Sequence, residues 1–305
     1  MKRCTHKENQ MGKTLYLECR AGISGDMFVA SLLDLGADEE ALREGLTSLA
    51  VDGFEIKITR VKKSGLDVCD FDVILDGEHE NHDHDMNYLH GGKSHEHSHY
   101  YKEVHPHEYP YYHGDEAKHH EHELEHHHGE TYHHEHRGLH EIYDIIDRSS
   151  ITERAKMIAR KIFRVLAEAE SKAHGVPAEN VHFHEVGAVD SIVDVIAVGI
   201  CIDSLDITEV IVPELWEGIG TVRCQHGILP IPVPAVANIV AAHHIRIHIT
   251  DVEGELVTPT GAAIVAALRT GKTLPDGFEI EKIGLGAGKR DYKTSGFVRA
   301  MLISG

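Results

Sequence analysis

The sequence predicts an α/β or α+β fold, a layered mixed sheet with flanking helices that a disordered His-rich insertion interrupts. Short segments that are β-branched, or that alternate apolar and polar residues, predict strands. Between them lie longer segments whose apolar residues recur at helical spacing. Hydrophobic residues make up 41% of the 305 residues, which is enough material for a buried core. The stretch from Glu78 to Glu141 lacks this alternation of apolar segments and holds 20 of the 28 histidines.

The segment before this stretch predicts the element order β-α-α-β-β. Residues 14–19 alternate as a strand does, and the apolar helix that follows ends at Gly36. Asp38 is the expected N-cap of the second helix, because a short acidic side chain can accept from the free N–H groups of a first turn. Strands at 54–61 and 66–75 are separated by a connection of hairpin length.

The segment after the stretch alternates helices with strands. A capping box at Ser150 begins a helix whose apolar residues recur at helical spacing as far as Gly175. Further helices are predicted at 191–205, from Pro234 and from Pro259, since proline suits the first helical turn. The strands predicted here lie at residues 208–212, 221–227, 245–250 and 278–283, the last of these being the final strand.

The domain organisation follows from these elements. We expect an N-terminal extension at residues 1–12, a domain formed by 13–77 together with 139–305, and a low-complexity acidic insertion at 78–138. Ordered sequence resumes directly after the insertion, which therefore interrupts the domain rather than ending it.

Charge and cysteine usage exclude several classes of protein. The formal net charge is −20, which gives no electrostatic reason to bind nucleic acid or an anionic membrane and instead attracts cations. No apolar run reaches the length of about 18 residues that predicts a membrane-spanning helix. Five cysteines without a CxxC pair are typical of a reducing compartment, so we expect a cytoplasmic protein.

The His-rich stretch indicates a transition metal. Imidazole is a preferred ligand of nickel, zinc and copper, and carboxylates add harder oxygen donors, so Ni²⁺ or Zn²⁺ fits better than Cu(I) or an iron–sulfur cluster. The alternative is a solvated loop without a ligand. The candidate ligands are His126, His127, His128, His133, His134 and His136.

The densest chemical signal outside this stretch is HFHEVGAVDSIVDV. His182 and His184 project to one side of an extended segment, with Glu185 adjacent, and Asp190 and Asp194 share a face if a helix begins near residue 189. These groups can form a mixed site for Ni²⁺, Mn²⁺ or Mg²⁺. Alternatively, the first aspartate caps the helix and one histidine belongs to the core.

The turn AGISGDM is a candidate anion site. Gly22 and Gly25 permit a tight turn, and the helix that follows offers free N–H groups to a phosphate or carboxylate. Ser24 can add a hydroxyl, and Asp26 can hold a cation or cap the helix. The Walker A pattern is absent, and a purely structural turn is the alternative.

The segment GLGAGKRD is a second candidate. Its glycines, including Gly286 and Gly288, precede Lys289 and Arg290 and predict a phosphate-binding loop. A plain flexible loop is the alternative, and the Rossmann pattern is absent.

Two weaker patterns remain. In TPTGAA, Thr258 or Thr260 can bind phosphate at a helix N-terminus or cap it. In RCQHG, Cys224 and His226 can ligate a metal as a pair, or can be a buried thiol and a strand histidine.

Taken together, YLECRAGISGDMFVASLLDLGA, HRGLHEIYDIIDRS, VHFHEVGAVDSIVDV, GILPIPVPA, TPTGAAIVAAL and GLGAGKRD resemble the LarC family of nickel-insertion proteins. The resemblance implies a cytoplasmic enzyme that inserts Ni²⁺ into pyridinium-3,5-bisthiocarboxylic acid mononucleotide to form the nickel-pincer nucleotide cofactor. Such a nickel chelatase, or cyclometallase, belongs to the lyases, consumes CTP with Mn²⁺ or Mg²⁺, and forms nickel–carbon and nickel–sulfur bonds.

The resemblance covers the N-terminal part of the family only. Full-length members continue into a C-terminal domain that carries the CTP site, so a C-terminal LarC-type partner polypeptide is expected, and a homo-oligomer as well. The catalytic set would be His182, His184, Glu185 and Asp190, to which the His-rich loop supplies nickel. The alternative function is a non-catalytic nickel or zinc storage or metallochaperone protein.

Overall fold

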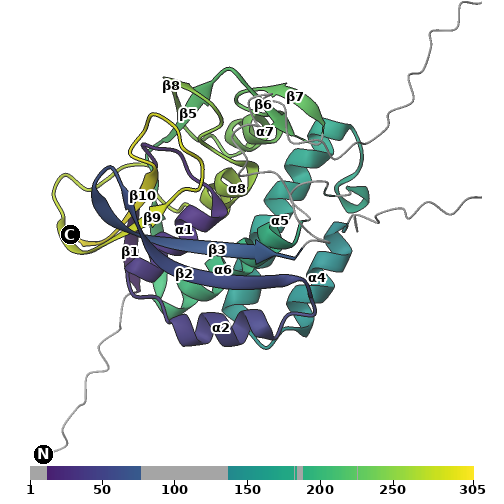
Figure 1. Cartoon of the computed structure of the whole chain (residues 1–305), viewed down its shortest axis with the longest axis horizontal. Helices are drawn as coiled ribbons and strands as arrows, with labels where there is room; N and C mark the ends of the chain where they lie inside the picture. The colour runs from purple at the N-terminus through teal and green to yellow at the C-terminus, as the bar shows by residue number, and fades with distance from the viewer. Residues whose placement is uncertain (1–11, 77–136, 182, 184–187, 225) are drawn as a thin grey trace, which may run out of the picture.

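A six-stranded mixed sheet carries the fold, with the strand order β2-β3-β9-β10-β1-β4 (Figure 1). The computed structural model describes residues 12–76, 137–181, 183, 188–224 and 226–305. Strand β1, next to the edge strand β4, pairs antiparallel with β10 and parallel with β4. The strands are β1 Lys13–Glu18, β2 Phe54–Lys63, β3 Leu66–Leu75, β4 Ile207–Ile211, β9 Glu279–Ala287 and β10 Phe297–Ser304.

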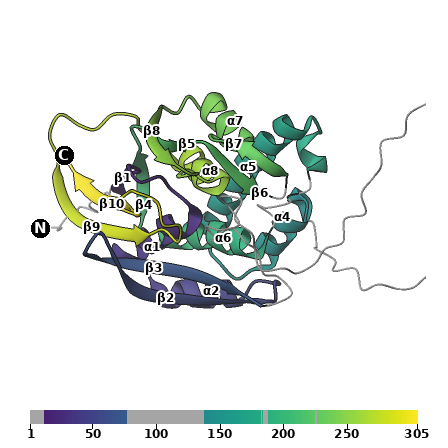
Figure 2. The same ribbon diagram turned by 45° about the horizontal axis from the view of Figure 1, so that its top comes forward.

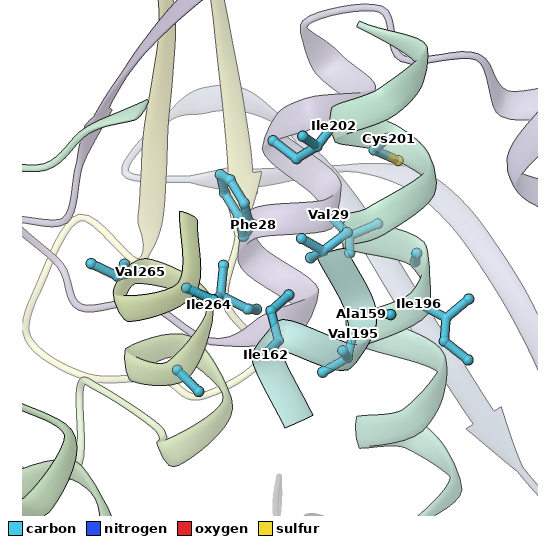
Figure 3. Packing of buried hydrophobic residues seen from close by; sticks show 14 of the residues in the cluster. Phe28, Val29, Ala159, Ile162, Val195, Ile196, Cys201, Ile202, Ile264 and Val265 are labelled. Atoms are coloured by element: carbon cyan, nitrogen blue, oxygen red, sulfur yellow. The ribbon is translucent and has the colours of Figure 1, made fainter. Parts of the chain in front are cut away.

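Helices cover one face of this sheet. Helix α1 lies against β3, β9 and β10, and α6 lies behind it, while α5 contacts α4, α6, α7 and α8. Figure 3 shows the core between them, where Phe28 of α1, Ile162 of α5, Val195 of α6 and Ile264 of α8 meet. The helices are α1 Gly25–Asp34, α2 Glu39–Thr47, α4 Leu139–Arg148, α5 Glu153–His174, α6 Val189–Ser204, α7 Pro234–Ala242 and α8 Pro259–Leu268, with a 3-10 turn at Ala178–Asn180.

Two small sheets lie with α7 at one end of the molecule, opposite the β2–β3 hairpin and α2 (Figures 1 and 2). Strand β5, Leu215–Ile219, pairs parallel with β8, Ile247–Glu253. Strand β6, Thr221–Cys224, pairs antiparallel with β7, Gly227–Pro230.

In the described part of the chain, no helix combines the length and apolarity needed to cross a membrane.

The turn after β1 connects two parts of the chain that are distant in sequence. Gly22 has a φ of +86°, and a Cβ there would stand 2.0 Å from the carbonyl oxygen of Leu256. Next to it, the N–H of Ile23 donates to that carbonyl at 2.9 Å, and the N–H of Thr258 donates to the carbonyl of Ile23 at 3.1 Å. Glycine is therefore required for the β1–α1 turn to join the loop that precedes α8.

The predicted class, a layered mixed sheet with flanking helices, is confirmed for the described residues, and several details are wrong. The N-cap of α5 is Thr152, whose hydroxyl accepts from Ala155, and not Ser150. Strand β5 was not predicted, and β10, not residues 278–283, is the final strand. In GLGAGKRD the first four residues extend β9 rather than forming a loop, because Phe297 to Ala300 of β10 pair with them.

Candidate functional site

The N-termini of four helices meet at one cavity of about 330 Å³, which we call the cleft. Helices α1, α6, α7 and α8 come from widely separated parts of the sequence, yet the first turn of each lines this space. The lining residues they supply are Ser24, Gly25, Asp26, Met27, Asp190, Ser191, Asp194, Val233, Pro234, Ala235, Thr258, Pro259 and Thr260.

Three of these four helices begin without a side-chain cap. The N-cap residues of α1, α6 and α7 are Ser24, Ala188 and Val233, and within the described residues none of the three makes a capping hydrogen bond. Only α8 is capped, by Thr258, whose hydroxyl accepts from the N–H of Gly261 at 3.1 Å. First-turn N–H groups and the positive ends of the helix dipoles therefore favour an anion in the cleft.

Three carboxylates, those of Asp26, Asp190 and Asp194, lie among these helix N-termini. Asp26 is 8% exposed, and its Oδ1 accepts from the hydroxyl of Ser24, whereas its buried Oδ2 has no hydrogen-bond partner in the described part of the chain. The same holds for Oδ1 of Asp194, although the backbone N–H of Asp26 donates to that carboxylate. A Cβ on Gly25 would stand 2.4 Å from Oδ2 of Asp194, so glycine permits this approach.

The electrostatics of this group favour a cation. Burial, followed by the nearby charges of Asp26 and Asp190, raises the pKa of Asp194 well above its usual range, and Lys289 opposes the shift. Unpartnered carboxylate oxygens are costly in a buried site, and oxygen donors of this kind are what a hard divalent cation prefers. The cleft thus combines a place for a cation with N–H groups suited to an anion.

The carboxylates are an incomplete metal site. As the side chains stand, no three His, Cys, Asp or Glu residues within the described ranges form a group that could hold a metal ion. The predicted ligands His182, His184 and Glu185 lie outside the described residues, as do the candidate histidines of the His-rich stretch at 126–128, 133–134 and 136. Asp190 and Asp194 lie on α6, which begins at Val189, and both line the cleft.

The two predicted anion-binding segments reach the cleft only in part. Ser24, Gly25 and Asp26 of the first line it, and so do Gly288, Lys289 and Arg290 of the second, but Gly22 and Gly286 are not among the residues that line it. Gly22 permits the turn contact described above. A Cβ on Gly286 would stand 1.9 Å from the carbonyl oxygen of Met27, so this glycine lets α1 pack on β9.

The two cations of the second segment are paired with carboxylates. Nζ of Lys289 lies 2.6 Å from Oδ1 of Asp70 and 3.4 Å from Oδ1 of Asp72. Arg290 forms an ion pair with Glu255. A phosphate bound at either cation would have to compete with these carboxylates, so the uncapped helix N-termini are the better anion site.

Sequence reasoning missed a buried carboxyl that holds one wall of the cleft. Glu217 on β5 is fully buried, and its Oε1 accepts from the N–H groups of Gly218 at 2.8 Å, Leu256 at 2.8 Å and Val257 at 3.1 Å. It thereby fixes the loop that leads into Thr258. A single glutamate in a short strand has no local pattern that would reveal this role.

We expect the replacement Glu217→Gln to change how stability depends on pH. Burial raises the pKa of Glu217 to about 7, above its ordinary value of 4.5. The folded state therefore binds this proton more tightly than the unfolded state, and the associated stability is lost as pH rises from about 4.5 to about 7. Glutamine keeps an acceptor for the three N–H groups and does not ionise.

The measurement is denaturant unfolding at pH 5 and pH 8. From pH 5 to pH 8, the free energy of unfolding of the Gln variant should rise by about 2 kcal/mol relative to that of the parent. The figure follows from the size of the pKa shift of Glu217. The exposed Glu44→Gln is the matched control and should show no such gain. The expectation would be contradicted if the difference in free energy of unfolding between Glu217→Gln and the parent were the same at both pH values.

Comparison with known proteins identifies the family. The chain is 48% identical to a pyridinium-3,5-bisthiocarboxylic acid mononucleotide nickel insertion protein of Alkaliphilus metalliredigens, over 96% of this chain and 61% of that protein. It is 35% identical to the protein of that name from Acetivibrio thermocellus, over 95% of this chain and 60% of the relative. The corresponding protein of Clostridium acetobutylicum is 40% identical, over 95% and 64%.

The chain thus spans about 60% of the length of the curated relatives it matches. No solved structure matches it. The profile of the nickel insertion protein family matches residues 15–305, which include every described part of the cleft. The chain therefore belongs to the nickel insertion protein family.

Proposed function

We propose that this chain inserts Ni²⁺ into pyridinium-3,5-bisthiocarboxylic acid mononucleotide, and that both substrates meet in the cleft. The observation that carries the proposal is the juxtaposition of unpartnered carboxylate oxygens, on Asp26 and Asp194, with the uncapped N-termini of α1, α6 and α7. A reaction between a divalent cation and a phosphate-bearing ligand needs these two environments side by side. The names of the relatives supply the identity of the nucleotide.

The carboxylates are the proposed receiving site for nickel. Asp190 and Asp194 act with Asp26, which the fold adds to the set. The imidazoles of His182 and His184 and the carboxylate of Glu185 are proposed to complete the coordination, since they precede Asp190 by only a few residues. Mixed nitrogen and oxygen donors bind Ni²⁺ while leaving it exchangeable for the sulfur ligands of the substrate.

The helix N-termini are the proposed site for the phosphate of the mononucleotide. The first turns of α1 and α7 offer backbone N–H groups, and the side chain of Thr260, which is 8% exposed and lines the cleft, offers a hydroxyl. Holding the phosphate there would position the pyridinium ring beside the metal, and positioning is a large part of what such a site can contribute.

The remaining parts of the reaction are proposed from the resemblance to the family. We propose that formation of the nickel–carbon and nickel–sulfur bonds consumes CTP with Mn²⁺ or Mg²⁺. We further propose that the nucleotide site lies in the portion of the relatives' length that this chain does not span, and that a C-terminal polypeptide carrying it acts together with this chain.

The His-rich insertion, proposed at residues 78–138, would raise the local concentration of nickel near the cleft. Deleting residues 79–136 should therefore increase the nickel concentration for half-maximal insertion by about tenfold, with the maximal rate unchanged. A Gly/Ser segment of equal length in place of the insertion separates loss of the ligands from loss of the spacer. Unaltered nickel dependence in both variants would contradict a supply role.

The proposed function is tested by incubating the full chain with Ni²⁺, the mononucleotide and CTP, with and without a C-terminal partner polypeptide. Insertion predicts a nickel-containing nucleotide whose formation requires all components. A storage protein would instead bind several ions per chain and show no dependence on the nucleotide. Phosphate release without a nickel product would indicate a metal-dependent phosphohydrolase.

A further inference from the structure

Two histidines from distant elements face each other at the cleft. His174 is the last residue of α5 and His226 lies in the turn between β6 and β7, yet their ring centroids are 4.9 Å apart with an interplanar angle of 41°. Both line the cleft. Imidazoles so close together can supply two nitrogen ligands to one ion after small side-chain rotations.

A carboxylate orients the first of these rings. Glu170, one turn earlier on α5, places Oε2 at 3.3 Å from Nε2 of His174 and also lines the cleft. A carboxylate on one ring nitrogen fixes the imidazole and makes the other nitrogen a better ligand. In this arrangement Nδ1 of His174 is the atom suited to a metal.

A cysteine lies two residues before the second histidine. Cys224 is the last residue of β6, two positions before His226 and directly opposite Gly227 in the hairpin, and it lines the cleft as well. The other described cysteines, Cys19, Cys69 and Cys201, are buried. Burial raises the pKa of all three, that of Cys69 to about 11, so they are poor metal ligands.

We propose that His174, His226 and Cys224 form a transfer site that receives a divalent transition-metal ion at the cleft before the ion moves to the carboxylates. The inference rests on the proposed function and deepens it. Its nitrogen and sulfur donors are softer than the oxygens of Asp26 and Asp194 and favour Ni²⁺ or Zn²⁺ over Mg²⁺.

The donors have to move before they can bind an ion. As the side chains stand, they do not form a group that could hold a metal ion, so rotation of the side chains would bring the donors together. A donor set of three would leave coordination positions through which the ion can be handed on. When the nickel–sulfur bond forms, the thiol releases its proton to solvent, and the oxidation state of the metal does not change.

The test uses nickel titration of the full chain, followed by the thiolate-to-nickel charge-transfer absorption. The His-rich stretch contains no cysteine, so its histidines cannot produce this signal. We expect the absorption in the parent, its loss in Cys224→Ser, and a nickel affinity about tenfold lower in His174→Ala, His226→Ala and Glu170→Gln, the range typical of ligand-shell changes.

Two controls isolate the site. Cys4→Ser removes a cysteine outside the described residues, and His248→Ala removes a histidine that stacks on Trp216 with ring centroids 4.3 Å apart. Both should leave the absorption unchanged. Persistence of the signal in Cys224→Ser, or its absence from the parent, would overturn the transfer site whatever the insertion assay gives. The expected absorption without any insertion would refute the proposed function and leave the site standing.

Discussion

Replacing Asp194 with asparagine is expected to abolish nickel insertion, with a loss of at least about 100-fold, while the chain remains folded. The side chain lies in the first turns of α6 and accepts from the backbone N–H of Asp26. Asparagine has nearly the same shape and can keep that hydrogen bond, but it removes the negative charge that would hold Ni²⁺. The substitution therefore weakens binding of Ni²⁺ and leaves the packing of α6 against α1 unchanged.

Stability distinguishes this interpretation from simple damage to the fold. Burial and the neighbouring carboxylates oppose ionisation of Asp194, so the neutral variant should be as stable as the parent, or more stable by about 1 kcal/mol. Denaturant unfolding and the insertion assay are measured on the same preparation, with the exposed Asp276→Asn as control. Asp190→Asn and His184→Ala should also lose insertion. Full activity in these variants would refute the site.

The second large effect is expected at Gly286. Its Cα faces the backbone of α1 so closely that a Cβ would lie 1.9 Å from the carbonyl oxygen of Met27 and 2.6 Å from the N–H nitrogen of Ser31. Backbone atoms cannot move aside as a flexible side chain can. Gly286→Ala should therefore displace α1 from β9 and lower the free energy of unfolding by about 3 kcal/mol, the upper end for overpacking.

Displacement of α1 would also disturb the cleft, because Asp26 lies in its first turn. Gly277→Ala is the matched control, since a Cβ at Gly277 would meet no atom within 4 Å, and its stability should stay within about 0.5 kcal/mol of the parent. Thermal or denaturant unfolding measures both variants. A loss below about 1 kcal/mol for Gly286→Ala would mean that the helix and strand are not packed as described.

Local patterns predicted the helices and strands that have regular spacing and clear end signals. The helix that begins at Val189 does place Asp190 and Asp194 one turn apart, as the i, i+4 spacing indicates. Strand β10 was missed because FVRAMLIS has the composition of a helix as much as of a strand, and pairing with β1 and β9 decides its conformation.

The residues that line the cleft could be grouped from the sequence only where they are neighbours in sequence. Nothing local indicates that Asp26 lies beside Asp194, since the contact depends on how α1 packs against α6. The glycines of GLGAGKRD suggested a phosphate-binding loop, whereas Gly286 is required for helix–strand packing. A residue without a Cβ is required both where two backbone segments approach closely and where a ligand approaches the backbone. The sequence alone does not distinguish these two cases.

The central claim is that one cleft holds the metal and the phosphate of the mononucleotide together. It is tested by phosphorus NMR relaxation of the mononucleotide in the presence of the full chain and Mn²⁺, a paramagnetic ion that prefers the oxygen donors of the cleft over the imidazoles of the insertion. In the parent we expect strong relaxation enhancement of the phosphate signal, and in Asp194→Asn we expect its loss while the nucleotide still binds. Equal enhancement in the two proteins, or none in the parent, would contradict a shared site.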